Sequence, residues 1–487
     1  MERGADDTVQ DSSGTRTCDI ATNLSWPRTY LLIIVPPAAT VEETLANLPC
    51  AWSSFHGEVR LSEALRDEYV FPYLTNLQSL SMENCNQTTI TDEGFSHLVN
   101  LQFLTMSFCD QTTISDKAFR HLTNLQSLDM KNCDQETITD QAFSHLVNLK
   151  SLNMCLCDQT TITDEAFRHL TNLHCLSIGD CHQSTITNDA FRHLTNLKSL
   201  DMGGCKQSTI TDVAFCHFTN LESFDMCLCD QTTITDQAFS RLAKLRHLSM
   251  SNCCQSTITD ETFCHLMNLS SLDIGGCKQS TITDDAFRHL TNLKSLSMNY
   301  CTQSTITDTA FLHLMNLHNL SMSMCTQSTI TDKAFRHVVN LKSLMMIQCN
   351  QPTITDEAFC HLTNLQSLDM RGCDQTTITD QAFWHLFNLQ SLTIHECSQS
   401  TITGEAFRHL TNLRSLDMKN CHQSTITDDA FRHLANLHSL GMITDEAFCH
   451  LTNLRSLDIQ KCHQSRVTAE DVDEFAFFED VTLKDEV

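Results

Sequence analysis

The chain is poor in residues that interrupt regular structure and in long hydrophobic runs. Its 487 residues include only 12 glycines and 6 prolines, so no glycine- or proline-rich linker divides its body. The apolar run Tyr30–Val35 is much shorter than the roughly 20 residues that cross a bilayer. The acidic start Met1–Asp7 does not resemble a secretory signal. We therefore expect one elongated domain without a membrane span.

Positive charge is also scarce. The chain has 31 Lys and Arg against 59 Asp and Glu, a formal net charge of −28. Nucleic acid and anionic membranes need a cationic surface, so the sequence predicts no nucleic-acid partner and no membrane partner. Basic protein partners remain open.

Catalytic motifs are missing as well. The sequence contains no glycine-rich phosphate loop, no G-x-S-x-G motif and no zinc-finger spacing of Cys and His. Each Asp–His or Cys–His combination recurs along the whole chain, as expected for a scaffold rather than one active site. The sequence therefore predicts no enzyme, no cofactor, no metal site and no catalytic residue.

What the chain does contain is a repeated unit of 24 residues, seen most clearly in Leu362–His385. Such a period is typical of stacked repeats, in which no unit buries its apolar face alone. Positions in the unit are called columns, and column 1 is the opening residue. The seventeen opening residues are Leu74, Leu98, Leu122, Leu146, Leu170, Leu194, Phe218, Leu242, Leu266, Leu290, Leu314, Val338, Leu362, Leu386, Leu410, Leu434 and Leu451.

Apolar residues occupy columns 1, 4, 7 and 9, and cysteine occupies column 12, as in Leu122, Leu125, Leu128, Met130 and Cys133. This L-x-x-L-x-x-L-x-M-x-x-C pattern resembles the leucine-rich repeat over residues 74–465. The resemblance implies an α/β solenoid: a right-handed leucine-rich-repeat arc with a parallel β-sheet on its concave face and short helices on its convex face.

Two subtypes of the family remain open. The run Cys157–Asp164 is similar to the cysteine-containing repeats of F-box substrate receptors, with two extra residues before Ile-Thr-Asp. The run Ala166–Leu173 instead resembles the bacterial surface-antigen type, in which Ala-Phe precedes the strand.

One unit can be interpreted without the family. The alternation in Leu128–Met130 predicts a short strand with one buried face. Thr139 and Asp140 predict a helix start, followed by a buried stripe over one to two turns. Phenylalanine recurs in this stripe from Phe71 to Phe448, so we expect these rings to form the convex half of the core.

The concave face is expected to expose columns 6, 8, 10 and 11, of which the last two vary most between units. Aromatic and methionine side chains on an exposed sheet are typical of protein-binding hot spots. The alternative is unselected drift among duplicated units. The candidate partner-binding residues are Phe103, Phe108, Tyr300, Met324, Met345, Ile347, Asp369 and His395.

Cysteine, asparagine and glutamine also repeat by column. Of the 26 cysteines, sixteen lie in column 12, and we expect buried thiols that satisfy backbone carbonyls, with disulfides or metal as the alternative. Free thiols fit a reducing, intracellular, cytoplasmic location. Asn124 and Gln135, with their equivalents, are expected to form hydrogen-bond ladders between units.

The ends differ from the repeats. We expect a disordered segment at 1–27, an N-terminal cap or degenerate F-box-like module at 28–73, and an acidic C-terminal cap and tail at 466–487. The last step, from Leu434 to Leu451, is only 17 residues, so we expect an irregular coil at Gly441–Ile443.

These observations predict a monomeric, non-enzymatic scaffold that binds a protein ligand on its concave face. One alternative is the substrate-recognition subunit of an SCF-type ubiquitin ligase, which would bind the ligase adaptor through 28–73. The other is a surface adhesin, which would be secreted and carry oxidised cysteines.

Overall fold

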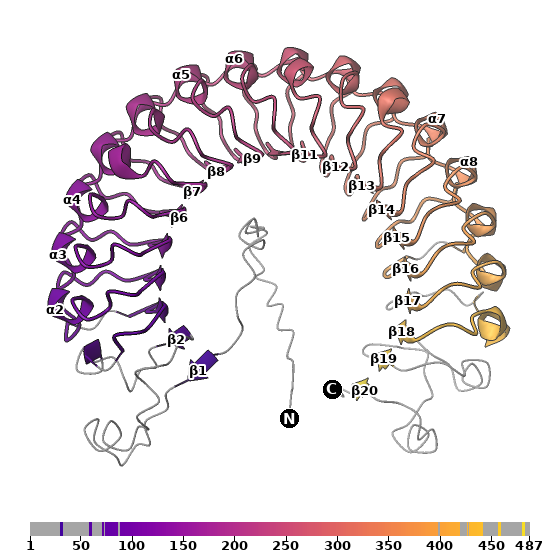
Figure 1. Cartoon of the computed structure of the whole chain (residues 1–487). Helices are drawn as coiled ribbons and strands as arrows, with labels where there is room; N and C mark the ends of the chain where they lie inside the picture. The colour runs from indigo at the N-terminus through magenta and orange to yellow at the C-terminus, as the bar shows by residue number, and fades with distance from the viewer. Residues whose placement is uncertain are drawn as a thin grey trace.

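The computed structural model describes residues 30–32, 58–60, 71–72, 74–85, 88–397, 400–418, 426, 428–441, 456–458 and 480–482. The chain winds into an open arc, with strands along the inner side and short helices along the outer side (Figure 1). The predicted α/β solenoid with a concave parallel sheet is confirmed.

The strands form one 20-stranded sheet in which each strand pairs in parallel with the next one in sequence. Within the repeats the register advances by one unit, as in Ser127 opposite Ser151. The strands are β1 Tyr30–Leu32, β2 Glu58–Arg60, β3 Ser79–Ser81, β4 Phe103–Thr105, β5 Ser127–Asp129, β6 Ser151–Asn153, β7 Cys175–Ser177, β8 Ser199–Asp201, β9 Ser223–Asp225, β10 His247–Ser249, β11 Ser271–Asp273, β12 Ser295–Ser297, β13 Asn319–Ser321, β14 Ser343–Met345, β15 Ser367–Asp369, β16 Ser391–Thr393, β17 Ser415–Asp417, β18 Ser439–Gly441, β19 Ser456–Asp458 and β20 Asp480–Thr482.

The convex helices are short segments of α or 3₁₀ type. They are α2 Asp92–Phe95, α3 Asp116–Phe119, α4 Asp140–Phe143, η4 Asp164–His169, η5 Asn188–Phe191, α5 Asp212–Phe215, α6 Asp236–Phe239, η6 Asp260–His265, η7 Asp284–Phe287, η8 Asp308–His313, α7 Asp332–Phe335, α8 Asp356–Phe359, η9 Asp380–Phe383, η10 Gly404–Phe407 and η11 Asp428–His433.

These helices match the predicted one to two turns. In α4, Thr139 caps the first turn by accepting a hydrogen bond from the Gln141 amide. The α-helix then ends at Phe143, and the Leu146 amide instead donates to the Phe143 carbonyl over 3.1 Å. Such i→i+3 turns carry the chain back toward the next strand.

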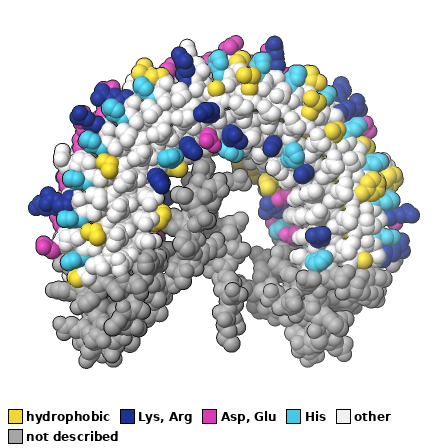
Figure 2. Space-filling model, viewed as in Figure 1, with side chains coloured by type: hydrophobic (Ala, Val, Ile, Leu, Met, Phe, Trp, Pro, Cys, Tyr) yellow, Lys and Arg dark blue, Asp and Glu magenta, His cyan; other side chains and the backbone are white. Residues whose placement is uncertain are grey.

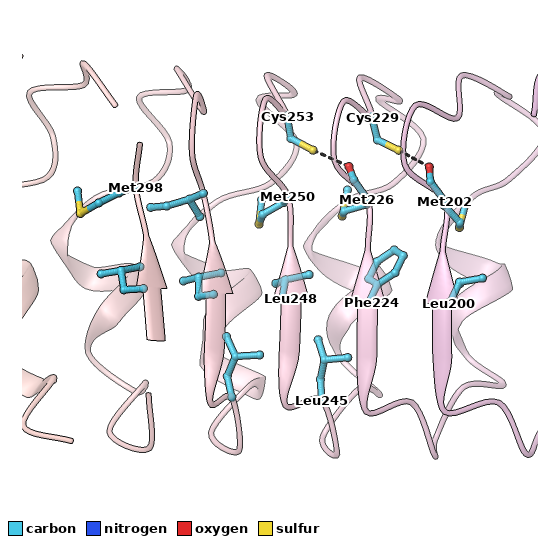
Figure 3. Close-up of a cluster of buried hydrophobic side chains, with 14 of the residues drawn as sticks. Leu200, Met202, Phe224, Met226, Cys229, Leu245, Leu248, Met250, Cys253 and Met298 are labelled. Atoms are coloured by element: carbon cyan, nitrogen blue, oxygen red, sulfur yellow. Dashed lines mark hydrogen bonds between the residues drawn. The ribbon is translucent and has the colours of Figure 1, made fainter. Parts of the chain in front are cut away.

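The core runs without interruption along the arc. The column-22 phenylalanines from Phe71 to Phe431 are buried, so the predicted convex half of the core is confirmed over the described residues. On the strand side, Figure 3 shows Leu200, Phe224 and Leu248 in line on successive strands, with methionines beyond them. Each unit therefore buries its apolar face against its two neighbours.

Polar ladders join the units. The Asn124 amide nitrogen donates to the Val99 carbonyl over 2.9 Å, and this bond recurs along the arc, as expected. The glutamine ladder is confirmed only in part. Gln135 donates to the Cys109 carbonyl, but neither amide atom of Gln159 has a partner among the described residues.

The predicted ends fall largely outside the described residues. β1 and β2 lie in 28–73 and β20 lies in 466–487, and all three extend the sheet. Segment 1–27 lies outside the described residues, as do most of 28–73 and of 466–487. At the short unit, β18 and β19 pair over two residues instead of three, while 442–450 is not described. The domain boundaries and the irregular coil remain predictions.

Candidate functional site

The concave face is built from columns 6 and 8 of the strands. In β5, Leu128 is buried, whereas Ser127 and Asp129 are half-buried on the opposite side of the strand. This alternation follows from the pleat, which points successive side chains to opposite faces. The face is therefore a ribbon of serine and short polar residues, and larger side chains stand out on it.

A tight turn follows each strand and places column 11 at the rim. From unit 74 to unit 386 every column-11 residue has a positive φ, between 53° and 69°. Only three of these residues are glycine, although the left-handed conformation costs a non-glycine residue about 1–2 kcal/mol. The positions are Asn84, Phe108, Asn132, Leu156, Asp180, Gly204, Leu228, Asn252, Gly276, Tyr300, Met324, Gln348, Gly372 and Glu396.

The column-8 aspartates stabilise this turn. The Asp129 carboxylate accepts hydrogen bonds from the Lys131 amide over 3.0 Å and from the Ser107 hydroxyl over 2.8 Å. The Asp201 and Asp273 carboxylates accept from the amide two residues on in the same way. These carboxylates are therefore turn caps as well as surface charges.

Four of the candidate residues lie together. Tyr300, Met324, Met345 and Ile347 come from three successive units, and the Met324 amide donates to the Ile347 carbonyl over 2.8 Å. Tyr300 is 58 % exposed, and the other three are half-buried. We call these four residues the Tyr300 patch. It is the part of the concave rim where the predicted hot spot has a continuous surface.

Asp369 lies opposite Met345 of the patch, and His395 lies one unit further along the arc; both are already paired. The Arg371 Nε donates to both carboxylate oxygens of Asp369. One terminal nitrogen of Arg371 also donates to Asp369 Oδ2, over 2.9 Å. This hydrogen bonding raises the pKa of Arg371 above its ordinary value. His395 lies 3.3 Å from the Glu396 carboxylate. A partner would therefore meet polar pairs here rather than single charges.

Phe103 and Phe108 lie far from the other candidates. They belong to the unit of β4, whereas the Tyr300 patch begins at the unit of β12, eight units along the arc. Lys131 lies above the Phe108 ring, 5.9 Å from its centroid. The eight predicted residues therefore form two separate surfaces rather than one.

Sequence reasoning did not select two exposed apolar side chains that lie between these surfaces. Leu156 and Leu228 are exposed column-11 side chains, each preceded by a cysteine, Cys155 or Cys227. Burial, followed by the Asp201 charge, raises the pKa of Cys155 to about 11, so its thiol stays protonated at neutral pH. The identical run Met-Cys-Leu-Cys in two units of the sequence could have identified these exposed leucines.

The column-12 thiols are structural. Cys229 donates to the Met202 carbonyl and Cys253 to the Met226 carbonyl, over 2.9 and 2.8 Å (Figure 3). All cysteines in the described part of the chain are free thiols. The predicted role, satisfying backbone carbonyls, is confirmed.

The described part of the chain offers neither a metal cluster nor a membrane helix. Among these residues, no three His, Cys, Asp or Glu side chains are grouped closely enough to hold a metal ion. Within the same ranges, the helices all fall short of the length and apolar character that crossing a membrane requires.

Similar solved structures share the fold. Toll in its complex with Spatzle, from Drosophila, matches in a glycosylated form with TM-score 0.57 and 18% identity, over 88% of this chain and 61% of Toll. A second Toll–Spatzle structure has TM-score 0.56 and 17% identity, over 82% and 62%. The chain thus spans about three fifths of the Toll chains. A leucine-rich-repeat protein of Leptospira interrogans matches more weakly, with TM-score 0.45 and 18% identity, over 88% and 90%.

Family models identify the repeats directly. A model of the BspA-type leucine-rich repeat region matches residues 256–372 and 328–443. A second model, described as a leucine-rich repeat region, matches residues 70–298. No curated protein matches the chain. With the stacked parallel strands and the buried repeat columns, these matches establish that the chain belongs to the leucine-rich-repeat proteins.

Proposed function

We propose that the chain is a non-enzymatic platform that binds a protein partner on its concave face, with the Tyr300 patch at the centre of the contact. Leucine-rich-repeat families generally bind proteins or other ligands, which supports binding as the broad activity. The concave face and the choice of patch rest on the side chains of this chain.

One observation carries the choice of patch. Tyr300 keeps a large aromatic side chain 58 % exposed at a φ of 59°, where glycine serves in other units. Its neighbours Met324, Met345 and Ile347 add apolar surface that water does not favour. An aromatic anchor surrounded by adaptable methionines fits the centre of a protein interface.

The test compares two triple variants of the full chain. Tyr300→Glu, Met324→Glu and Ile347→Glu place charge in the patch. Val213→Glu, Met267→Glu and Met315→Glu place the same charge on apolar side chains that are 59–61 % exposed elsewhere. Proteins captured from the source cells are identified by mass spectrometry, and circular dichroism confirms folding.

We expect a set of proteins captured by the wild type and by the control variant to be lost with the patch variant. A folded patch variant that captures the same set in the same amounts would contradict the proposal.

The BspA-type match over residues 256–443 favours the surface-adhesin alternative over the ligase alternative. An adhesin is expected to carry oxidised cysteines, whereas the described cysteines are free and the column-12 thiols donate to carbonyls. This supports the proposal of a reducing, intracellular setting. The ligase alternative depends on 28–73, of which only short parts are described.

A further inference from the structure

A second surface lies at the other end of the strands. Column 5 directly precedes each strand, whereas Tyr300, Met324 and Ile347 of the Tyr300 patch follow their strands, so these side chains and those of column 5 lie at opposite rims of the sheet. Column-5 backbones are joined from unit to unit, as in the Lys150 amide, which donates to the Gln126 carbonyl over 2.7 Å. Column-5 side chains therefore stand in a row at regular intervals.

Every second position in part of this row is a cation. The cations are Lys150, Lys198, Arg246, Lys294 and Lys342, all exposed, and we call them the basic row. The positions between them hold His174, Glu222, Ser270 and His318. Figure 2 shows dark-blue side chains along the inner rim of the arc, with magenta and cyan ones among them. A chain of net charge −28 thus concentrates positive charge on one rim.

The basic row is available to a ligand. No member forms an ion pair with another described residue, and Lys150 only donates to the Gln126 side chain over 2.9 Å. The intervening His174 and His318 rings fold back, each with Nδ1 2.6 Å from a backbone carbonyl two residues before it. The long cationic side chains therefore project past their neighbours.

Two polar grooves lie along this rim. One of about 630 Å³ is lined by ladder asparagines, by column-5 glutamines and by Lys150 and His174. The other, of about 530 Å³, is lined by ladder asparagines and by Glu222, Lys244, Arg246, Ser270 and Lys294. The ladder asparagines use their amide nitrogens to bind carbonyls of the preceding unit, as Asn292 does over 2.9 Å. Their side-chain oxygens can accept hydrogen bonds from N–H groups of a ligand.

The spacing of the cations identifies the ligand class. Neighbouring strands lie about 4.8 Å apart, so cations on every second strand repeat at about 9.6 Å. A polyproline II helix rises about 3.1 Å per residue, so every third residue returns to the same face after about 9.3 Å. Its backbone makes no internal hydrogen bonds, so the N–H groups of its non-proline residues are free to donate to the asparagine oxygens of the grooves. We propose that the basic row and its grooves bind an extended acidic peptide with a carboxylate at every third residue.

Nucleic acid fits this surface poorly. A duplex carries one charge per about 1.7 Å of its axis, far denser than cations about 9.6 Å apart. Single strands bind where aromatic side chains stack on the bases, and columns 3 and 5 hold no aromatic ring other than histidine in the described units.

The experiment measures fluorescence polarisation of a labelled peptide of five Glu-Pro-Pro triplets with the full chain at low salt. A peptide of the same composition, with its five glutamates consecutive and prolines on both sides, controls for spacing. A single-stranded DNA 12-mer controls for ligand class. The row variant carries Lys198→Glu, Arg246→Glu and Lys294→Glu. The matched control carries three such changes at exposed cations of column 23 on the convex side, namely Arg120→Glu, Arg192→Glu and Arg288→Glu.

We expect the row variant to bind the triplet peptide at least about tenfold more weakly than wild type, because three attractions become repulsions, and the control variant to change by less than about twofold. Glu222→Gln removes the acid within the basic row and should tighten binding. Equal binding of the two peptides, stronger binding of the DNA, or an unchanged row variant would overturn the proposal. The Tyr300 patch takes no part in this experiment, so either proposal can fail alone.

Discussion

At the scale of the residue, burial in the fold keeps the column-12 cysteine thiols protonated. Burial is the main cause that raises the pKa of Cys229, Cys277 and Cys325 to about 12, above their ordinary value of 9.0. Each thiol therefore remains a neutral donor to a backbone carbonyl. Ionising such a thiol would place a charge in the core and remove that donor.

The raised pKa of these thiols determines the sign of the pH dependence of stability. In the unfolded chain the thiols lose their protons as the pH rises through their ordinary pKa of 9.0, whereas the folded chain keeps them to higher pH. The unfolded state thus binds fewer protons, and the free energy of unfolding falls as pH rises between about 9 and 12. We expect the urea midpoint to be constant from about pH 7 to 8 and to drop steadily from about pH 9 upward.

Replacing these thiols is the control. Cys229→Ala, Cys277→Ala and Cys325→Ala together should lower stability at neutral pH but reduce the alkaline loss, because three groups no longer titrate. If the urea midpoint falls equally steeply with pH in the variant and the wild type, the thiols are not the cause of the alkaline loss of stability.

The left-handed backbone conformation of column 11 could not be predicted from the sequence. Its occupants include Phe108, Leu156 and Tyr300, none of which favours a positive φ. A glycine pattern would have predicted the turn, but only three units have glycine there. The sequence therefore identified Phe108 and Tyr300 as variable and apolar, but not the turn that places them on the rim.

At the scale of the element, each helix start is held by the unit before it. The Asp212 carboxylate accepts from the Thr235 amide over 2.7 Å and from the Thr235 hydroxyl over 2.8 Å. The same hydroxyl oxygen caps α6 by accepting from the Gln237 amide. The Thr-Asp pair predicted as a helix start is thus also a joint between units, a role that needs the stacked structure to be seen.

This joint can be tested against a natural substitution. Asn188 occupies the aspartate column and still accepts from the Thr211 amide over 2.9 Å and donates to its hydroxyl over 3.0 Å. We therefore expect Asp212→Asn to cost less than about 1 kcal/mol and Asp212→Ala about 2 kcal/mol, because only alanine removes both bonds. Hydrogen exchange over β9 and α6 measures the local opening. Equal protection in the two variants would contradict this account.

At the scale of the whole molecule, the sum of charges proved a poor guide to where charge lies. A net charge of −28 correctly describes the chain, yet an exposed cation recurs in column 5 at every second unit from Lys150 to Lys342, so positive charge lines one rim. The regular period and the buried columns were sufficient to predict the sheet, the core and its curvature. The distribution of side chains between the two rims depends on where each strand begins and its turn ends, which the periodicity alone does not specify.

A stack of units unravels most easily where a contact between neighbours is missing. Columns 10–16 are missing between Met442 and Ile443, so this unit lacks the cysteine, glutamine and threonine that join its neighbours elsewhere. Inserting Lys-Asn-Cys-His-Gln-Ser-Thr there would supply a thiol for the Met418 carbonyl and a hydroxyl for the Ile426 carbonyl. Two such bonds should raise the local opening free energy by about 1–3 kcal/mol.

Hydrogen exchange measured by mass spectrometry over residues 428–441 tests this directly, because β18 lies within the short unit. We expect slower exchange with the native-like insertion than with the wild type. A Gly-Ser insertion of the same length restores the length of the coil without its donors, so it should protect β18 less. If both insertions protect β18 equally, coil length rather than the lost hydrogen bonds limits the end of the arc.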